Sequence, residues 1–101
     1  MNLIDDHCHL THVLYKDDIN EVIQRAKAAG IIRILVPGVN PPSNREVLKL
    51  VQQHPDILRA SLGIYPIDAL GLAEGDSGLH LQKTPIDIDI ELQFINEHKQ
   101  Q

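Results

Sequence analysis

DDINEVIQRAKAAGIIRILV, residues 17–36, joins a helical pattern to a strand pattern through one glycine. Its apolar side chains recur with the i, i+3, i+4, i+7 spacing of one helical stripe, at Ile19, Val22, Ile23 and Ala26. The acidic residues before the stripe favour a helix start, and Gly30 favours a left-handed helix end. The run IIRILV that follows is typical of a short buried strand. The stretch therefore predicts a helix over 17–30 and a strand over 31–36.

The same alternation continues on both sides of this stretch. Residues 2–6 have the apolar pattern of a first strand, and residues 57–63 have that of a third. Between the second and third strands, Ser43 and Glu46 form a capping-box pattern, which predicts a helix from Ser43 to about His54. Helices that alternate with strands imply parallel pairing and right-handed crossovers. We therefore predict an α/β fold with about three βα units and parallel strands.

The end of the chain carries a long loop pattern and then an ambiguous apolar run. Residues 64–84 are rich in Gly, Asp, Ser and Pro and exceed ordinary connections in length, and we predict a flexible loop over 71–84. The alternation IDIDIE at 86–91 fits a half-exposed strand, but Pro85 is a good helix opening. A helical stripe is also present, at Ile88, Leu92 and Ile95. We predict a helix here, with IDIDIE as its solvated start.

The length, net charge and cysteine count of the chain exclude some classes of function. The chain has 101 residues, enough for one small domain over 1–101, and its net charge is −5 with no basic run. A stand-alone nucleic-acid binder normally shows a basic patch, but a nuclease can meet phosphate with a bound metal instead. The single cysteine, Cys8, excludes an internal disulfide framework. No signal peptide or membrane-length apolar stretch is present, so we expect a cytoplasmic protein with no membrane partner.

The sequence IDDHCHL at residues 4–10 places two histidines, His7 and His9, one residue apart. If the first strand runs on through them, both imidazoles and Asp5 point to one face, and Cys8 points toward the core. Two neutral imidazoles that converge from one strand are half of a metal site. The alternative is two polar residues at a strand end that bond to their neighbours. Asp5 is expected to support the bound metal from the second shell, or else simply to cap the end of the strand.

Other polar residues carry weaker signals. Four histidines have no spacing that pairs them, and we expect surface or capping roles for His12, His54, His80 and His98. Asp68 is expected to organise its loop by bonding backbone amides. Cys8 is expected to be a small core residue, because a buried thiol is inert.

Taken in order, these segments resemble the N-terminal part of the TatD family of metal-dependent deoxyribonucleases, which are amidohydrolase-like barrels. IDDHCHL resembles the family's opening Asp-Ser-His-Cys-His-Leu. AKAAGIIRILVPGVNPPSN, residues 26–44, resembles its first helix, second strand and the loop beyond. HPDILRASLGIYPIDAL, residues 54–70, resembles its third strand and Gly-x-His-Pro-x-Asp-Ala segment. The resemblance covers nearly all of the chain outside 71–84.

The resemblance implies a partial (β/α)₈ TIM barrel and a hydrolase that acts on the phosphodiester bonds of DNA. His7 and His9 match the family's first two ligands for a divalent metal ion, which could be Mg, Mn, Co or Zn. Tyr65 stands where most members have a histidine near the substrate phosphate, so it is the expected substrate-binding residue. Asp6 replaces the usual Ser or Thr and adds a carboxylate beside the site.

The family's later functional residues have no counterpart in these 101 residues. They are a metal-bridging Glu after the fourth strand, two more His ligands and a catalytic Asp, so no catalytic residue is assigned here. We therefore expect a truncated member. The alternative is a non-catalytic fragment that folds by forming a homo-oligomer or by docking with a complementary chain. A third hypothesis is a small module whose copies share a metal through their histidine pairs.

Overall fold

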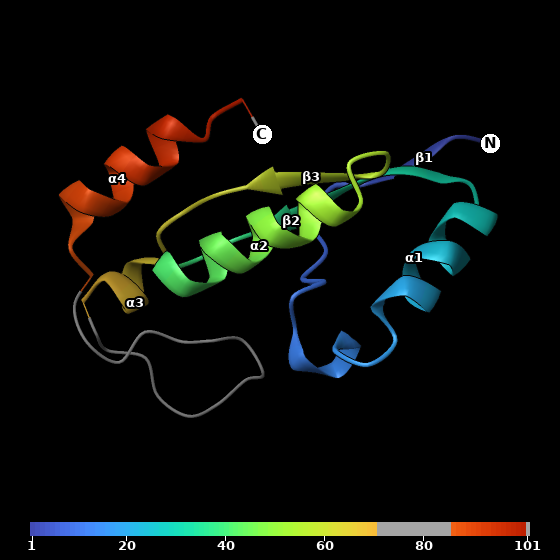
Figure 1. Cartoon of the computed structure of the whole chain (residues 1–101), viewed down its shortest axis with the longest axis horizontal. Helices are drawn as coiled ribbons and strands as arrows, with labels where there is room; N and C mark the ends of the chain where they lie inside the picture. The colour runs from blue at the N-terminus through green and yellow to red at the C-terminus, as the bar shows by residue number, and fades with distance from the viewer. Residues whose placement is uncertain (71–85, 101) are drawn as a thin grey trace.

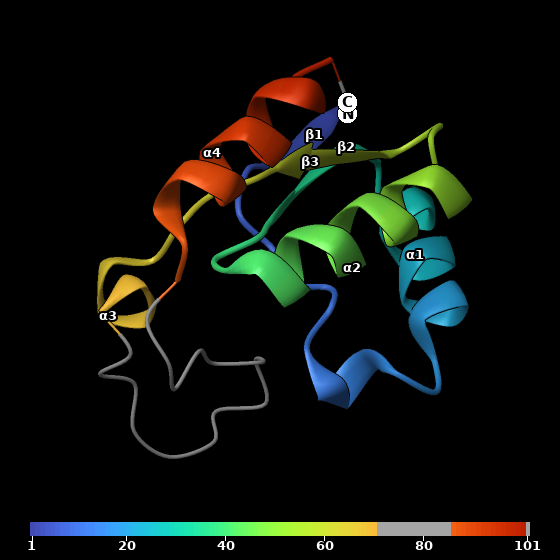
Figure 2. The same cartoon turned by 60° about the vertical axis from the view of Figure 1, so that its left-hand side comes forward.

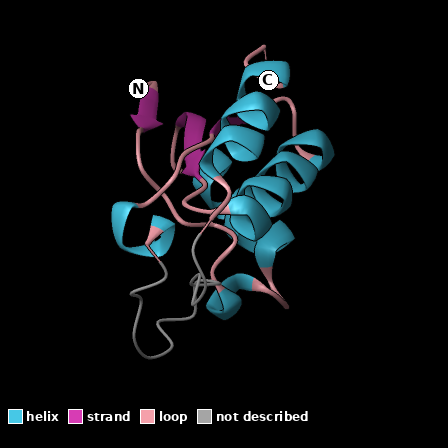
Figure 3. Ribbon diagram, turned by 90° about the vertical axis from the view of Figure 1, so that its left-hand side faces the viewer, coloured by secondary structure: helices cyan, strands magenta, loops and turns pink. Residues whose placement is uncertain are grey.

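The computed structural model describes residues 1–70 and 86–100 (Figure 1). Its elements in chain order are β1 (Leu3–Asp5), a 3₁₀ turn η1 (Val13–Tyr15), α1 (Ile19–Ala28), β2 (Ile31–Pro37), α2 (Pro41–Gln53), β3 (Leu58–Ser61), α3 (Pro66–Ala69) and α4 (Ile88–Glu97). The strands are short, and helices make up much more of the described chain (Figure 3). No helix in these two ranges has the length and apolar character needed to cross a membrane.

The three described strands form one parallel sheet in the order β1-β2-β3. Helix α1 connects β1 to β2, and α2 connects β2 to β3, as a right-handed βα repeat requires. In Figure 2, α1 and α2 lie together on one side of the strands, and α4 lies alongside β3 and the first turn of α2. The predicted α/β class with parallel strands is confirmed. Successive strands are neighbours, which is also the order within a (β/α)₈ barrel.

The core lies between the sheet and helices α1 and α2. Its buried apolar side chains come from α1, β2, α2, β3 and two connecting segments, and they are Leu10, Ile23, Ile34, Val36, Val47, Val51, Ile57 and Leu58. The predicted stripe on α1 faces this core, because Ile23 is buried and the other three members pack against it. The strand predicted over 31–36 is confirmed as β2. The periodicity of apolar residues along the chain therefore predicted the positions of α1 and β2.

Helix α1 ends as its glycine predicts. Gly30 has a φ of 94°, the left-handed region that side chains with a Cβ rarely adopt. A Cβ there would also overlap the Met1 carbonyl oxygen. The Gly30 carbonyl accepts a bond from the Leu3 amide at 2.8 Å, which fastens β1 to the start of β2.

Helix α2 begins earlier than predicted. Its first residue is Pro41, and its N-cap is Asn40, whose side chain accepts from the Ser43 amide at 3.0 Å. Ser43 Oγ in turn accepts from the Asn40 amide at 3.0 Å, which completes a reciprocal capping box. The predicted Ser43–Glu46 box was therefore wrong, because the Pro-Pro pair after Asn40 already fits the first turn of a helix.

Three other boundaries differ from prediction. The first strand ends at Asp5, so residues 6–10 are not part of it. The third strand is shorter than 57–63, and the short helix α3 occupies the start of the predicted loop at 64–84. The segment 71–84, predicted as a flexible loop, lies outside the described residues.

The predicted final helix is present as α4, and Asp87 caps it by accepting from the Ile90 amide at 3.1 Å. Its orientation differs from the expectation. Ile88 and Leu92 are exposed, whereas Glu91 is only 1% exposed. IDIDIE is therefore not wholly solvated, because its last residue is a buried carboxylate with polar partners on α2.

Candidate functional site

Each segment that follows a strand is bonded to a neighbouring strand, or to the segment after it, at one edge of the sheet. After β1, the Cys8 amide donates to the Leu35 carbonyl at 3.0 Å. After β2, the Gly38 amide donates to the Ser61 carbonyl at 2.7 Å. After β3, the Tyr65 amide donates to the Val39 carbonyl at 2.6 Å. Because the strands are parallel, their carboxyl ends share this edge, which is where α/β folds place their sites.

His7 and His9 meet at this edge. Their Nε2 atoms lie 3.1 Å apart, and the rings are almost perpendicular, with centroids 4.9 Å apart and an interplanar angle of 79°. The rings converge although the segment is not a strand, since the turn of the chain after Asp5 replaces strand alternation. The structure therefore brings together the two residues that the sequence singled out.

The distance between the two nitrogens fits a shared metal ion. Imidazole nitrogens bind transition metals at about 2.0–2.1 Å, so two of them on one ion lie roughly 2.9–3.4 Å apart. The observed 3.1 Å falls within that interval. The same distance also fits a hydrogen bond from the N–H of one neutral ring to the other ring, which is the simpler alternative. Both states need at least one deprotonated Nε2.

Burial and nearby charge favour the neutral imidazole at His9. Partial burial lowers the pKa of His9, and the nearby charges of His7 and His12 lower the pKa further. Neutral imidazole is the form that binds a metal. Within residues 1–70 and 86–100, however, no group of three or more His, Cys, Asp or Glu side chains could hold an ion. The described part of the chain therefore offers two ligands, half of a tetrahedral shell.

Asp5 and Cys8 support the segment that carries the histidines. Asp5 Oδ1 accepts from the His7 amide at 3.1 Å, a bond that both predicted roles of Asp5 allow. Cys8 packs against the core, as predicted. Burial raises the pKa of the Cys8 thiol, and the charge and hydrogen bond of Asp5 raise it further. A thiol with a raised pKa is a weak nucleophile and a poor metal ligand.

Tyr65 follows β3 at the same edge of the sheet. Its side chain is 44% exposed, and its backbone amide is bonded to the segment after β2. Tyr65 is therefore partly accessible to solvent, and its backbone is held in place. Asp6 is exposed.

Three of the four remaining histidines have the predicted surface or capping roles. His12 Nδ1 accepts from the Leu14 amide at 3.1 Å and caps η1, His54 is the C-cap residue of α2, and His98 Nδ1 lies 2.7 Å from the Phe94 carbonyl. His80 and the Asp68 side chain lie outside the described part of the chain.

A polar cluster beside the strand ends was not predicted. It contains Asn44 and Glu91, both buried, together with Arg45, whose guanidinium pairs with Glu91 Oε1 at 2.9 Å. Asn44 carries no local sequence signal. Glu91 carries a faint one, because it lies four residues before Ile95 and so shares that apolar residue's side of the helix.

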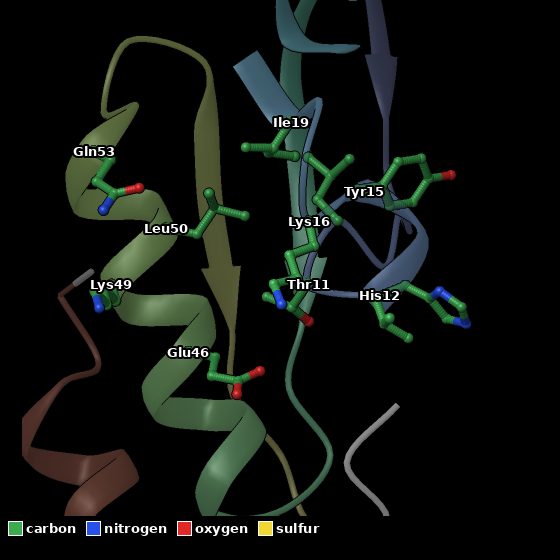
Figure 4. Close-up of a pocket in the computed structure, with 11 residues that line it drawn as sticks. Thr11, His12, Tyr15, Lys16, Ile19, Glu46, Lys49, Leu50 and Gln53 are labelled. Atoms are coloured by element: carbon green, nitrogen blue, oxygen red, sulfur yellow. The ribbon is translucent and has the colours of Figure 1, made fainter. Parts of the chain in front are cut away.

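A groove of about 580 Å³ lies between α2 and the segment 10–19 (Figure 4). Ile19 and Leu50 point into it from opposite sides, and Glu46 and Lys49 lie along its α2 side. None of the predicted site residues lines this groove. It is therefore separate from the histidine pair.

Comparison with known proteins identifies relatives. Residues 4–96 match the sequence model of a family described as TatD related DNase. The chain is 36% identical over 74 residues, 73% of its length and 29% of the relative's, to the "Uncharacterized metal-dependent hydrolase YabD" of Bacillus subtilis.

Two further relatives are named as nucleases. The chain is 33% identical over 64 residues, 63% of its length and 25% of the relative's, to a "3'-5' ssDNA/RNA exonuclease TatD" of Erwinia tasmaniensis. It is 23% identical over 99 residues, 98% of its length and 34% of the relative's, to the human "Deoxyribonuclease TATDN3". The chain thus matches between about a quarter and a third of each relative's length.

Proposed function

The chain belongs to the family of TatD-related DNases, and on that premise we propose that it forms part of a metal-dependent hydrolase that cleaves phosphodiester bonds in nucleic acid. The relatives are named as a metal-dependent hydrolase, an exonuclease of single-stranded DNA and RNA, and a deoxyribonuclease. The observation that carries the proposal is the 3.1 Å approach of His7 Nε2 and His9 Nε2 at the end of β1. The single cysteine is in keeping with action in the reducing cytoplasm.

In this proposal, His7 and His9 hold a divalent ion, which could be Mg, Mn, Co or Zn. Such an ion supplies Lewis acidity toward a phosphoryl oxygen and lowers the pKa of water. Asp5 supports the metal ligands without binding the ion, because its bond to the His7 amide fixes the segment that carries both rings. Tyr65 donates its hydroxyl hydrogen to a phosphate oxygen of the substrate. Imidazole ligands suit Zn better than Mg, so Zn and its spectroscopic substitute Co are the first ions to test.

Metal binding by the chain itself is the first test. We expect isothermal titration with Zn²⁺ and the visible spectrum of added Co²⁺ to show binding, weakened at least about tenfold in His7→Ala and in His9→Ala. His54→Ala is the matched control, since it removes an imidazole at the far end of α2. Equal affinity in the wild type and the double variant His7→Ala/His9→Ala would remove the metal assignment.

Hydrolysis is the second test. Short single-stranded DNA and RNA oligonucleotides are incubated with the chain and each of Mg²⁺, Mn²⁺, Co²⁺ and Zn²⁺. Cleavage is expected in the wild type and in His54→Ala and is expected to be absent from the double histidine variant. Cleavage that survives loss of both imidazoles would refute their role.

A second candidate function is a non-catalytic piece that associates with another chain. The observation that favours it is the set of exposed large apolar side chains on the edge strand β1 and on α4, namely Leu3, Ile4, Ile88, Ile90 and Leu92. Exposed apolar groups on an edge strand favour association. Sedimentation equilibrium of the chain alone should then show a homo-oligomer. With a complementary chain added, it should show a complex of the two. A folded monomer across the micromolar range argues against it, and one Zn²⁺ per two chains would indicate a metal shared between copies.

A further inference from the structure

The Asn44 side chain, in the first turn of α2, joins three parts of the fold that are distant in sequence. Asn44 Nδ2 donates to the Gly63 carbonyl at 2.9 Å and to Glu91 Oε1 at 2.8 Å. Asn44 Oδ1 accepts from the Gly63 amide at 3.1 Å. The carboxamide therefore pairs with Gly63 through both a donor and an acceptor, as a neighbouring peptide group would. This pairing lies just beyond the Gly38-to-Ser61 bond that ends the β2–β3 contact.

The position accepts only asparagine. Both Nδ2 hydrogens and Oδ1 have partners, so the carboxamide has one possible orientation. On its other side the carboxamide packs against Gly38, where a Cβ would overlap Oδ1 and lie 3.0 Å from Asn44 Cα. A longer side chain has no room there. Aspartate has the right shape but would turn an oxygen toward the Gly63 carbonyl and the Glu91 carboxylate.

Glu91 holds the far side of the carboxamide. Its two carboxylate oxygens both lie 2.9 Å from Arg45 Nη1, and the Arg45 guanidinium lies 3.8 Å above the Phe94 ring. A carboxylate buried to this extent is stable only with its charge paired and its oxygens bonded. Asn44 and Arg45 meet that need, so Glu91, together with the contact of Phe94 on Arg45, attaches α4 to the start of α2.

The network ends at the site. Gly63 lies two residues before Tyr65, and the Tyr65 amide is bonded to Val39 in the segment after β2. We infer that Asn44, held by Glu91, is a positioning residue that fixes residues 63–65 at the carboxyl edge of the sheet and so sets the place of the Tyr65 side chain. The inference rests on the proposed function only for the role of Tyr65 toward a phosphate.

The test is native-state amide hydrogen exchange by NMR, which needs neither metal nor substrate. In Asn44→Asp, the Gly63 and Tyr65 amides are expected to lose at least about tenfold in protection relative to the Ile34 amide of β2. Val51→Ala is the control, since it weakens the buried face of α2 without touching the network. It should lower protection at all three amides together. Equal losses at all three amides in Asn44→Asp, or none, would overturn the inference.

The double variant Asn44→Asp/Glu91→Gln guards against a single variant that fails to fold. In this variant the glutamine side chain at position 91 can donate to the aspartate at position 44, so no two carboxylates repel each other. An aspartate oxygen still faces the Gly63 carbonyl. Loss of Gly63 and Tyr65 protection is therefore expected here too, and wild-type protection would refute the inference. In the cleavage assay, Asn44→Asp should raise KM while leaving Zn²⁺ affinity unchanged. Absence of cleavage by the wild type would count against the proposed function alone, because the exchange result stands independently.

Discussion

Gly38→Ala should destabilise the fold, because its added Cβ displaces the Asn44 side chain from its hydrogen bonds. Gly38 has no positive φ, so its backbone conformation is open to alanine. The added Cβ, however, would overlap Asn44 Oδ1 and would lie 3.0 Å and 3.1 Å from Asn44 Cα and Cγ. The α2 backbone cannot retreat easily, because its first turn is held by the reciprocal capping box. The Asn44 side chain must therefore leave its position.

The magnitude follows from the bonds that Asn44 makes. Its departure breaks two bonds to Gly63 and one to Glu91. Each such bond contributes about 1 kcal/mol net, and a buried polar group left without its partner costs about 1–3 kcal/mol. We expect a loss of about 3–5 kcal/mol in the free energy of unfolding. A domain of this size has roughly 5–15 kcal/mol in all, so the variant should be severely weakened.

Urea unfolding followed by far-ultraviolet circular dichroism measures this loss. Gly63→Ala is the graded comparison, because a Cβ there would lie 3.2 Å from the Gly38 carbonyl oxygen, a tight contact but not an overlap. It should therefore cost less than Gly38→Ala. A Gly38→Ala variant within about 0.5 kcal/mol of wild type, the range of an ordinary surface substitution, would show that Asn44 is not held as described.

Three further outcomes test the fold. Leu58→Ala, at a fully buried core residue, should lower the free energy of unfolding by about 3 kcal/mol, whereas Leu92→Ala, at a side chain that is 52% exposed, should stay within about 0.5 kcal/mol by the same urea assay. Gly30→Ala should cost at least about 1–2 kcal/mol, because the left-handed φ of 94° penalises a Cβ and that Cβ would also overlap the Met1 carbonyl oxygen. The hydrogen bond from Lys27 lowers the pKa of Asp56 below its usual 3.8, so this pair's stabilisation is complete above pH 3.8 and disappears as pH falls through the lower folded-state pKa. Urea midpoints measured across that window should therefore fall more steeply in wild type than in Asp56→Asn, and parallel curves would contradict the pairing.

Much of the fold was predictable because its signals are local. The apolar stripe from Ile19 to Ala26 on α1 faces the core of the fold. The glycine after that helix adopts the predicted left-handed conformation. Both depend on neighbours within a few residues along the chain. The class of the sheet followed from the order of these elements, because a helix between two strands constrains them to lie parallel.

The site was predictable in part. The one-residue spacing of His7 and His9 indicated convergence, and the rings do converge. The expected mechanism, a continuous strand, was wrong, because the extended pairing stops at Asp5 and the chain turns. The start of α2 was misplaced for a related reason. Two capping patterns overlap there, and only the bonds that form distinguish Asn40 from Ser43 as the cap.

The sequence by itself determined the repeating units, the orientation of α1 against the core and the pairing of two histidines, since each depends on spacing along a few residues. Only the tertiary structure decided that Asn44 and Glu91, which are 47 residues apart, are buried and bonded to each other. A carboxylate in an acidic run is expected to be solvated, and it becomes a buried tether only when another helix supplies an amide and a guanidinium. That supply depends on how α4 packs beside α2, a long-range arrangement that no local pattern encodes.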